Sequence, residues 1–193
     1  MTRTKILAFI VAIVGSLFFI LSYLNSPETW ESHNKKGVKA FHEGHHIEAE
    51  KHFVKALELA EDFPPGDHRL YFSLGQLAEI YRIQSKFSEA EQVIQRTLEV
   101  DEEVFGATHP NRALNLNNLA ANYRVQGKYP EAEALLKQAL KILEDSFGKD
   151  HVLVGNILEH YAYLLKKMDR SAEAEKLENR YKKIFAKQET ENQ

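Results

Sequence analysis

The sequence predicts an all-α fold of about four helix–turn–helix repeats, preceded by a single membrane-spanning helix. Three observations lead to this prediction. Similar short stretches recur about every 42 residues, short polar turns separate the helix-patterned runs, and an uncharged apolar run of 19 residues extends from Ile6 to Leu24. A repeat of this period indicates stacked structural units, and an apolar run of this length indicates a membrane span.

The apolar run, residues 6–24, is predicted to be a transmembrane signal-anchor helix. At about 1.5 Å per residue it would span roughly 28 Å, close to the thickness of a hydrocarbon core. A cleaved signal peptide is the alternative, although its apolar region is usually about 7 to 15 residues and is followed by an A-x-A-like site. Arg3 and Lys5 favour a cytoplasmic N-terminus at residues 1–5. The domain after the span would then lie across the membrane, in the periplasm if the organism is bacterial.

Composition limits the chemistry that the chain can perform. Its formal charge of −3 argues against general nucleic-acid binding, which needs a basic surface. The chain has no cysteine, so disulfides, thiolate metal sites and cysteine nucleophiles are excluded. Neither a phosphate-binding G-x-x-x-x-G-K-[ST] nor a G-x-S-x-G motif occurs. We therefore expect no enzyme activity and no cofactor.

The repeats are visible as four similar stretches, "IEAEK", "SEAEQ", "PEAEA" and "AEAEK". Their central alanines are spaced 41, 42 and 42 residues apart, at Ala49, Ala90, Ala132 and Ala174. A short polar turn precedes each stretch: "EGHH", "QSKF", "QGKY" and "MDRS". Glycines in the linkers are predicted to cap the second helix of each unit, at Gly66, Gly106 and Gly148. Each unit is therefore expected to be a helix, a tight turn, a second helix and a linker.

The stretch "LNLNNLAANYRVQGKYPEAEALLKQALKILEDSFGKDH" resembles a tetratricopeptide repeat of the kinesin-light-chain type. The resemblance implies a right-handed superhelix over residues 30–187, with repeats at about 30–69, 70–111, 112–153 and 154–187. Residues 25–29 would be a linker and residues 188–193 a polar tail. The fourth repeat departs from the pattern, because Glu178 stands where the others carry Phe53, Ile94 and Leu136. A polar residue is expected there if the unit is terminal and faces water.

"HEGHH", residues 42–46, matches the zinc-protease pattern H-E-x-x-H. That motif needs one continuous helix, whereas the repeat alignment places Gly44 in a turn, so the match is predicted to be coincidental. A solvated polar turn is favoured over a zinc or copper site formed by His42, His45, His46 and His52. Three other histidines recur at intervals of 41 and 42 residues and are predicted to be linker structure: His68, His109 and His151.

The resemblance also implies that the first helix of each repeat lines a concave groove, which binds a peptide or helix of a protein partner. Carried over by position, the groove-side polar candidates are Asn34, Gln76, Glu79, Arg82, Asn117, Arg124, Glu159 and Lys166. Asn117 and Arg124 share one helix face, so they could offer an amide and a guanidinium to a peptide backbone and carboxylate.

The predicted function is therefore a membrane-anchored, non-catalytic scaffold or adaptor. The alternative is an accessory or assembly subunit of a membrane protein complex, whose transmembrane helix also packs against partner spans. Small residues give that helix a partial stripe for such packing, at Ala8, Ala12, Gly15, Ser16 and Ser22.

Overall fold

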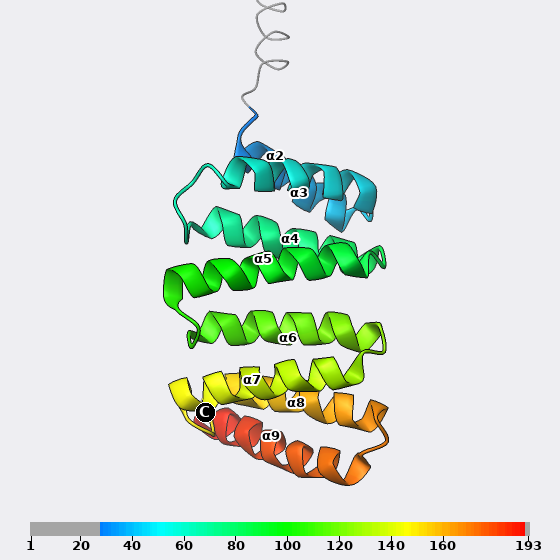
Figure 1. Cartoon of the computed structure of the whole chain (residues 1–193), viewed down its shortest axis with the longest axis vertical. Helices are drawn as coiled ribbons and strands as arrows, with labels where there is room; N and C mark the ends of the chain where they lie inside the picture. Colours follow the sequence, from blue (N-terminus) through cyan, green and yellow to red (C-terminus); the bar gives the residue numbers. More distant parts are fainter. Residues whose placement is uncertain (1–27, 192–193) are drawn as a thin grey trace, which may run out of the picture.

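The computed structural model describes residues 28–191, which form eight α-helices and no strand. In chain order they are α2 (Trp30–His42), α3 (His46–Ala60), α4 (His68–Ile83), α5 (Phe87–Phe105), α6 (Pro110–Val125), α7 (Tyr129–Phe147), α8 (Val152–Lys167) and α9 (Ser171–Glu191). Each helix packs against the next along the chain, and Figure 1 shows the stack running from α2 to α9. The predicted all-α repeat fold is confirmed for this part of the chain.

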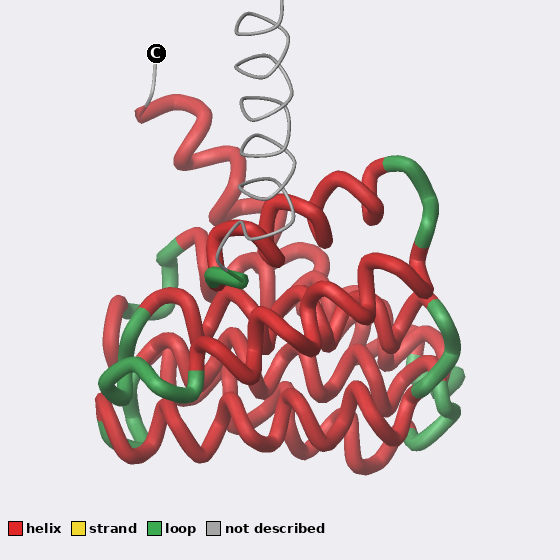
Figure 2. Tube along the Cα trace, turned by 90° about the horizontal axis from the view of Figure 1, so that it is seen from above, coloured by secondary structure: helices red, strands yellow, loops and turns green. Residues whose placement is uncertain are grey.

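The predicted transmembrane helix, residues 6–24, lies outside the described residues. Of the helices between residues 28 and 191, none is both long enough and apolar enough to cross a membrane. Seen from above, the turns and linkers of the stack gather mainly at two opposite sides (Figure 2). The helices therefore run back and forth between these two sides.

The turn inside each helix pair contains one residue in the left-handed region of backbone conformation. The four residues have φ values between +59° and +77° and occupy equivalent repeat positions: Gly44, Ser85, Gly127 and Asp169. A left-handed residue ends a helix because it turns the chain so that its own N–H and the next one donate to the last free carbonyl groups of the helix. Accordingly α2 ends at His42 and α3 begins at His46, which confirms that HEGHH is split between two helices.

The glycines of the linkers behave in two ways. Gly106 and Gly148 cap α5 and α7 with φ values of +88° and +84°, as predicted. The same prediction is wrong for Gly66, because α3 already ends at Ala60 and Glu61 is its cap. The helix stops early since Pro64 and Pro65 follow, and a residue before proline is disfavoured in helical conformation.

Recurring residues also mark the helix starts. His109 and His151 accept a hydrogen bond from the backbone N–H two residues later, each at 3.2 Å, and so cap α6 and α8. Their rings stack on Phe105 and Phe147 at centroid distances of 4.5 and 4.4 Å. At the start of α4 the equivalent cap is Asp67, and His68 is the first helical residue. The predicted linker role is confirmed for His109 and His151, whereas His68 belongs to α4.

The helix bounds differ slightly from the predicted repeat bounds. Helices α4, α6 and α8 begin at residues 68, 110 and 152, about two residues before the predicted starts of their repeats. At the other end, α9 extends to Glu191, so residues 188–191 of the predicted polar tail are helical.

Small side chains let the helices approach closely. The four repeat alanines are all fully buried: Ala49, Ala90, Ala132 and Ala174. In the first repeat the approach is tighter still, because a Cβ atom on Gly37 would lie only 2.7 Å from the buried ring of Phe53. The first pair of helices therefore needs glycine at position 37.

An ion pair joins each repeat to the next at an equivalent position, and we call these pairs the polar clamps. A glutamate near the start of one second helix pairs with a basic residue in the turn of the next repeat. The pairs are Glu50 with Lys86 at 2.7 Å, Glu91 with Lys128 at 3.9 Å, and Glu133 with Arg170 at 2.6 Å. Tyrosines strengthen the last two, since Tyr123 and Tyr161 donate to Glu91 and Glu133 at 2.7 Å.

Glu178 in α9 is only half-buried and forms an ion pair with Lys166 of α8. The hydrogen bond from Lys166 lowers the pKa of this carboxyl group, which stays ionised at neutral pH. The position is thus polar as expected, but its charge is paired rather than fully solvated.

Candidate functional site

The candidate site is a groove along the first helices of the second, third and fourth repeats. One cavity, of about 460 Å³, lies between α4 and α6, and another, of about 370 Å³, lies between α6 and α8. Both are lined by Asn117, Ala121, Arg124 and His160, so the two cavities adjoin each other. We call this combined feature the groove.

Five of the eight predicted groove residues line it: Glu79, Arg82, Asn117, Arg124 and Glu159. The other three do not. Lys166 forms an ion pair with Glu178 on α9 and lines neither cavity, and Gln76 also lines neither. Asn34 lies in α2, before the groove begins, with a buried side-chain oxygen that has no hydrogen-bond partner in residues 28–191.

Asn117 is held by a hydrogen bond across the groove. His160 Nδ1–H donates to Asn117 Oδ1 at 2.7 Å, because an amide oxygen can only accept. Burial lowers the pKa of His160, and nearby Arg124 adds to this effect while Glu159 opposes it. The neutral imidazole therefore fixes the orientation of the Asn117 side chain. The two N–H donors of the Asn117 amide take no part in this contact.

Arg124 lies over the ring of Tyr163, with its guanidinium carbon 4.8 Å from the ring centroid. Lys167 approaches the same ring at 5.5 Å. Arg124 forms no ion pair with any carboxylate of the described residues, unlike Arg82, which makes a bidentate pair with Glu79 at 2.6 to 3.0 Å. The α6–α8 part of the groove thus presents an uncompensated guanidinium oriented by an aromatic face.

Sequence reasoning missed His160 and Tyr163. They stand two periods of 42 residues after Gln76 and Glu79, which are both predicted groove residues. Applying the 42-residue period to these two positions therefore identifies His160 and Tyr163. The same period relates Arg82, Arg124 and Lys166, yet only the first two line the groove. Lys166 is the exception because it forms an ion pair with Glu178, and only the fourth repeat has a glutamate at that position.

The histidines of HEGHH do not form a metal centre together with His52. The rings of His42 and His46 pack against Phe41 at centroid distances of 5.8 and 6.0 Å. His52 contacts His33 instead. Over the described range, residues 28–191, no group of three or more histidine, cysteine or acidic residues could hold a metal ion.

Comparison with known proteins agrees with this architecture. The family model described as tetratricopeptide repeat matches residues 31–103, 70–145 and 112–187, which together cover residues 31–187. No curated protein matches the chain by sequence.

Several solved structures are similar in fold. A structure from Podosopora anserina, described as a kinesin light chain with nearly identical TPR-like repeats, has a TM-score of 0.73 at 19% identity, covering 92% of this chain and 86% of that one. BtubC (BKLC) from P. vanneervenii has a TM-score of 0.67 at 19% identity, covering 95% and 74%. MamA from Desulfovibrio magneticus RS-1 has a TM-score of 0.60 at 14% identity, covering 84% and 79%. The chain belongs to the tetratricopeptide repeat family, and its fold is similar to that of kinesin-light-chain-like repeat structures.

Proposed function

We propose that this chain is a membrane-anchored, non-catalytic module that binds a peptide or a helix of a protein partner in the groove. Tetratricopeptide repeats typically serve as protein-interaction surfaces rather than as enzymes, which supports the general class. The observation that carries the proposal is that Asn117 and Arg124 lie on one face of α6, that both are oriented, and that neither pairs with a carboxylate of residues 28–191.

The chemistry of this pair defines what it binds. A guanidinium and an amide present planar donors, which match a carboxylate and a peptide carbonyl respectively. The exposed face of Tyr163 beside Arg124 adds an apolar contact for an aliphatic or aromatic side chain. The partner is therefore a segment with a carboxylate, either an acidic side chain or a chain terminus, next to an apolar residue.

The proposed anchor is the apolar run at residues 6–24, with residues 1–5 in the cytoplasm and the repeat domain on the far side of the membrane. Its support is the length of the run and the charges of Arg3 and Lys5. Anchoring would confine the groove to one membrane face and raise the effective concentration of partners at that face.

The test is crosslinking in native membranes, followed by capture of the chain and measurement of the bound partner. The double variant Asn117→Ala/Arg124→Ala should reduce capture by about tenfold or more, since loss of oriented charged hydrogen bonds costs roughly 1.5 to 3 kcal/mol each. The matched control is Arg96→Ala/Gln138→Ala, which removes the same types of group from exposed positions on α5 and α7.

Equal capture by the groove variant and the control would contradict the groove assignment. Arg124→Lys sharpens the test because it keeps the charge but removes the planar fork, and it should give an intermediate loss. Recovery of a stoichiometric complex in mild detergent that persists in the double variant would instead favour the accessory-subunit alternative.

A further inference from the structure

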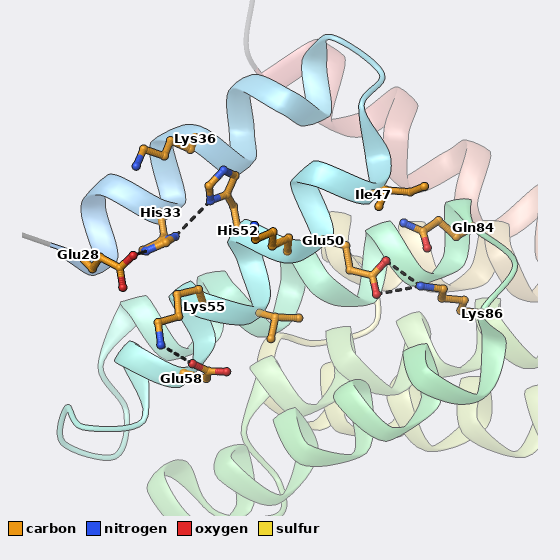
Figure 3. A pocket seen from close by; sticks show the side chains of 12 residues that line it. Glu28, His33, Lys36, Ile47, Glu50, His52, Lys55, Glu58, Gln84 and Lys86 are labelled. Carbon is orange, nitrogen blue, oxygen red and sulfur yellow. Dashed lines mark hydrogen bonds and ion pairs between the residues drawn. The ribbon is translucent and has the colours of Figure 1, made fainter. Parts of the chain in front are cut away.

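A pair of histidines in the first repeat is the feature that the groove does not explain. His33 from α2 and His52 from α3 face each other with their Nδ1 atoms 3.1 Å apart, and this contact is a hydrogen bond between the two rings (Figure 3). Their side chains are 8% and 17% exposed. A hydrogen bond between two ring nitrogens needs one N–H donor and one nitrogen without a proton. The contact therefore exists only while at least one of the two rings is neutral.

The pair lies beside a close contact between α2 and α3. His33 stands one helical turn before Gly37, and His52 directly precedes Phe53. A Cβ atom on Gly37 would lie only 2.7 Å from the ring of Phe53, which is fully buried. Because this packing holds the two helices at a fixed distance, two charged rings cannot move apart unless α2 leaves α3.

The surroundings of the pair favour neutral rings. Burial lowers the pKa of His33, and the nearby Glu28 opposes this effect without cancelling it. Burial also lowers the pKa of His52, and the ring of His33 lowers it further. The buried Nε2 atom of His33 has no hydrogen-bond partner in residues 28–191, so a charge on this ring is poorly solvated. The other charged groups around the pair are Lys36 from α2, Glu48, Lys51, Lys55 and Glu58 from α3, and Lys86, paired with Glu50, in the wall of the adjoining cavity of about 830 Å³.

We propose that the His33–His52 pair is a proton-sensitive switch that releases α2 from α3 in mildly acidic solution. In neutral solution the pair contributes one hydrogen bond between the two helices. The first added proton preserves this bond, since a charged ring still donates to a neutral one. The second proton removes the remaining acceptor and places two positive rings in contact at a site of low exposure, where they repel each other strongly.

The direction of the effect follows from the lowered pKa values. Both histidines have a pKa below the ordinary value of 6.5 while α2 is packed, and they return toward that value when α2 is released. The contribution of the pair to stability is thus complete above pH 6.5 and is lost as the pH falls below it. Each histidine that gains a proton on release raises the opening equilibrium by up to about 30-fold between roughly pH 7.5 and 5.0, and two raise it by up to about 1000-fold.

Release of α2 also uncouples the first repeat from the second. Trp30 at the start of α2 donates a buried hydrogen bond to Ser73 of α4 at 2.8 Å and packs edge-on against Phe72. It is the only tryptophan of the chain, so its indole N–H reports directly whether α2 is in place. The switch acts in α2 and α3 and on their contact with α4, and it depends on neither the partner nor the anchor proposed above.

The experiment measures hydrogen exchange in the full chain, solubilised in detergent, at about pH 7.5 and 5.0, with correction for the intrinsic exchange rate. Protection of the α2 amides should fall by about 30-fold or more relative to that of the α7 amides, and the indole N–H of Trp30 should lose protection with them. Glu133 and Glu178, which have lowered pKa values, stay ionised over this range, so the later repeats serve as an internal reference.

The variant His33→Gln/His52→Gln has no titratable group at the pair and should lose the pH response, while its amides can still bridge the two helices. The single variant His52→Gln keeps one imidazole and should respond to an intermediate degree, which keeps the test decisive if the double variant folds poorly. The matched control His42→Gln/His45→Gln/His46→Gln removes three histidines of the α2–α3 turn and should respond as the wild type does. Equal relative protection of α2 at both pH values in the wild type would overturn the proposal, as would a full response in the double variant or its loss in the control.

Discussion

The third and fourth repeats follow one pattern, yet they differ at the position that packs toward the next repeat. Leu136 in α7 is 3% exposed and belongs to the core, whereas its counterpart Glu178 in α9 is half-buried and charged. An interior second helix is covered on both sides, while α9 has no described helix beyond it. The difference also changes the groove, because Glu178 binds Lys166, which stands where the third repeat offers Arg124. Position within the stack therefore decides whether the same repeat residue is structural or available for binding.

The largest expected effect comes from exchanging these two residues. Leu136→Glu places a carboxylate among apolar neighbours and should lower the free energy of unfolding by about 4 kcal/mol or more, because a buried charge there has no partner. Glu178→Leu should change it by less than about 1 kcal/mol, since the lost ion pair is partly exposed. Urea denaturation followed by circular dichroism measures both. Equal losses in the two variants would mean that the third and fourth repeats are packed alike.

The polar clamps provide the next comparison. Glu133 is nearly buried and accepts from Tyr161, Lys137 and Arg170. Glu50 is more exposed, and within the described part of the chain its ion pair is with Lys86. Glu133→Gln should therefore cost about 2 kcal/mol, and the control Glu50→Gln less than about 1 kcal/mol. A larger loss for Glu50→Gln would show that the first clamp dominates the stacking.

The same carboxylate predicts a pH dependence. Burial alone would raise the pKa of Glu133, but hydrogen bonds from Lys137, Tyr161 and Arg170 outweigh it and lower the pKa from 4.5 to about 2. Its contribution to the free energy of unfolding is then fully present above pH 4.5 and is lost as the pH falls toward 2. The stability difference between wild type and Glu133→Gln should therefore shrink across this range. A constant difference would contradict the lowered pKa.

The smallest expected effect distinguishes the turns. Ser85 adopts φ of +59°, which favours glycine, whereas Gly127 has the residue type that its φ of +75° requires. Ser85→Gly should stabilise the chain by up to about 1 kcal/mol, and Gly127→Ala should destabilise it by about 1 kcal/mol. The space around Gly127 is open, so its change reports backbone strain alone. Thermal unfolding of both variants should shift Tm in opposite directions, and shifts of the same sign would indicate that side-chain contacts govern these turns.

Much of this architecture could be predicted because its signals are local or periodic. The break at Gly44, the caps at Gly106 and Gly148 and the roles of His109 and His151 depend on residues within one turn of a helix end. The prediction that Gly66 caps α3 is wrong because the two prolines before it end that helix early. Five of the predicted residues line the groove because the repeat places them on the same helix face.

The sequence by itself determined the helix pairs, their period, the turns and the small buried alanines, since these follow from backbone preferences and spacing that act within one repeat. Only the tertiary structure decided which polar groups meet across repeats. Asn117 meets His160 across 43 residues, and Lys166 turns to Glu178 rather than to the groove. His33 and His52 are likewise brought together only when α3 packs on α2. These contacts depend on the direction of side chains between packed helices, which repeat spacing alone does not specify.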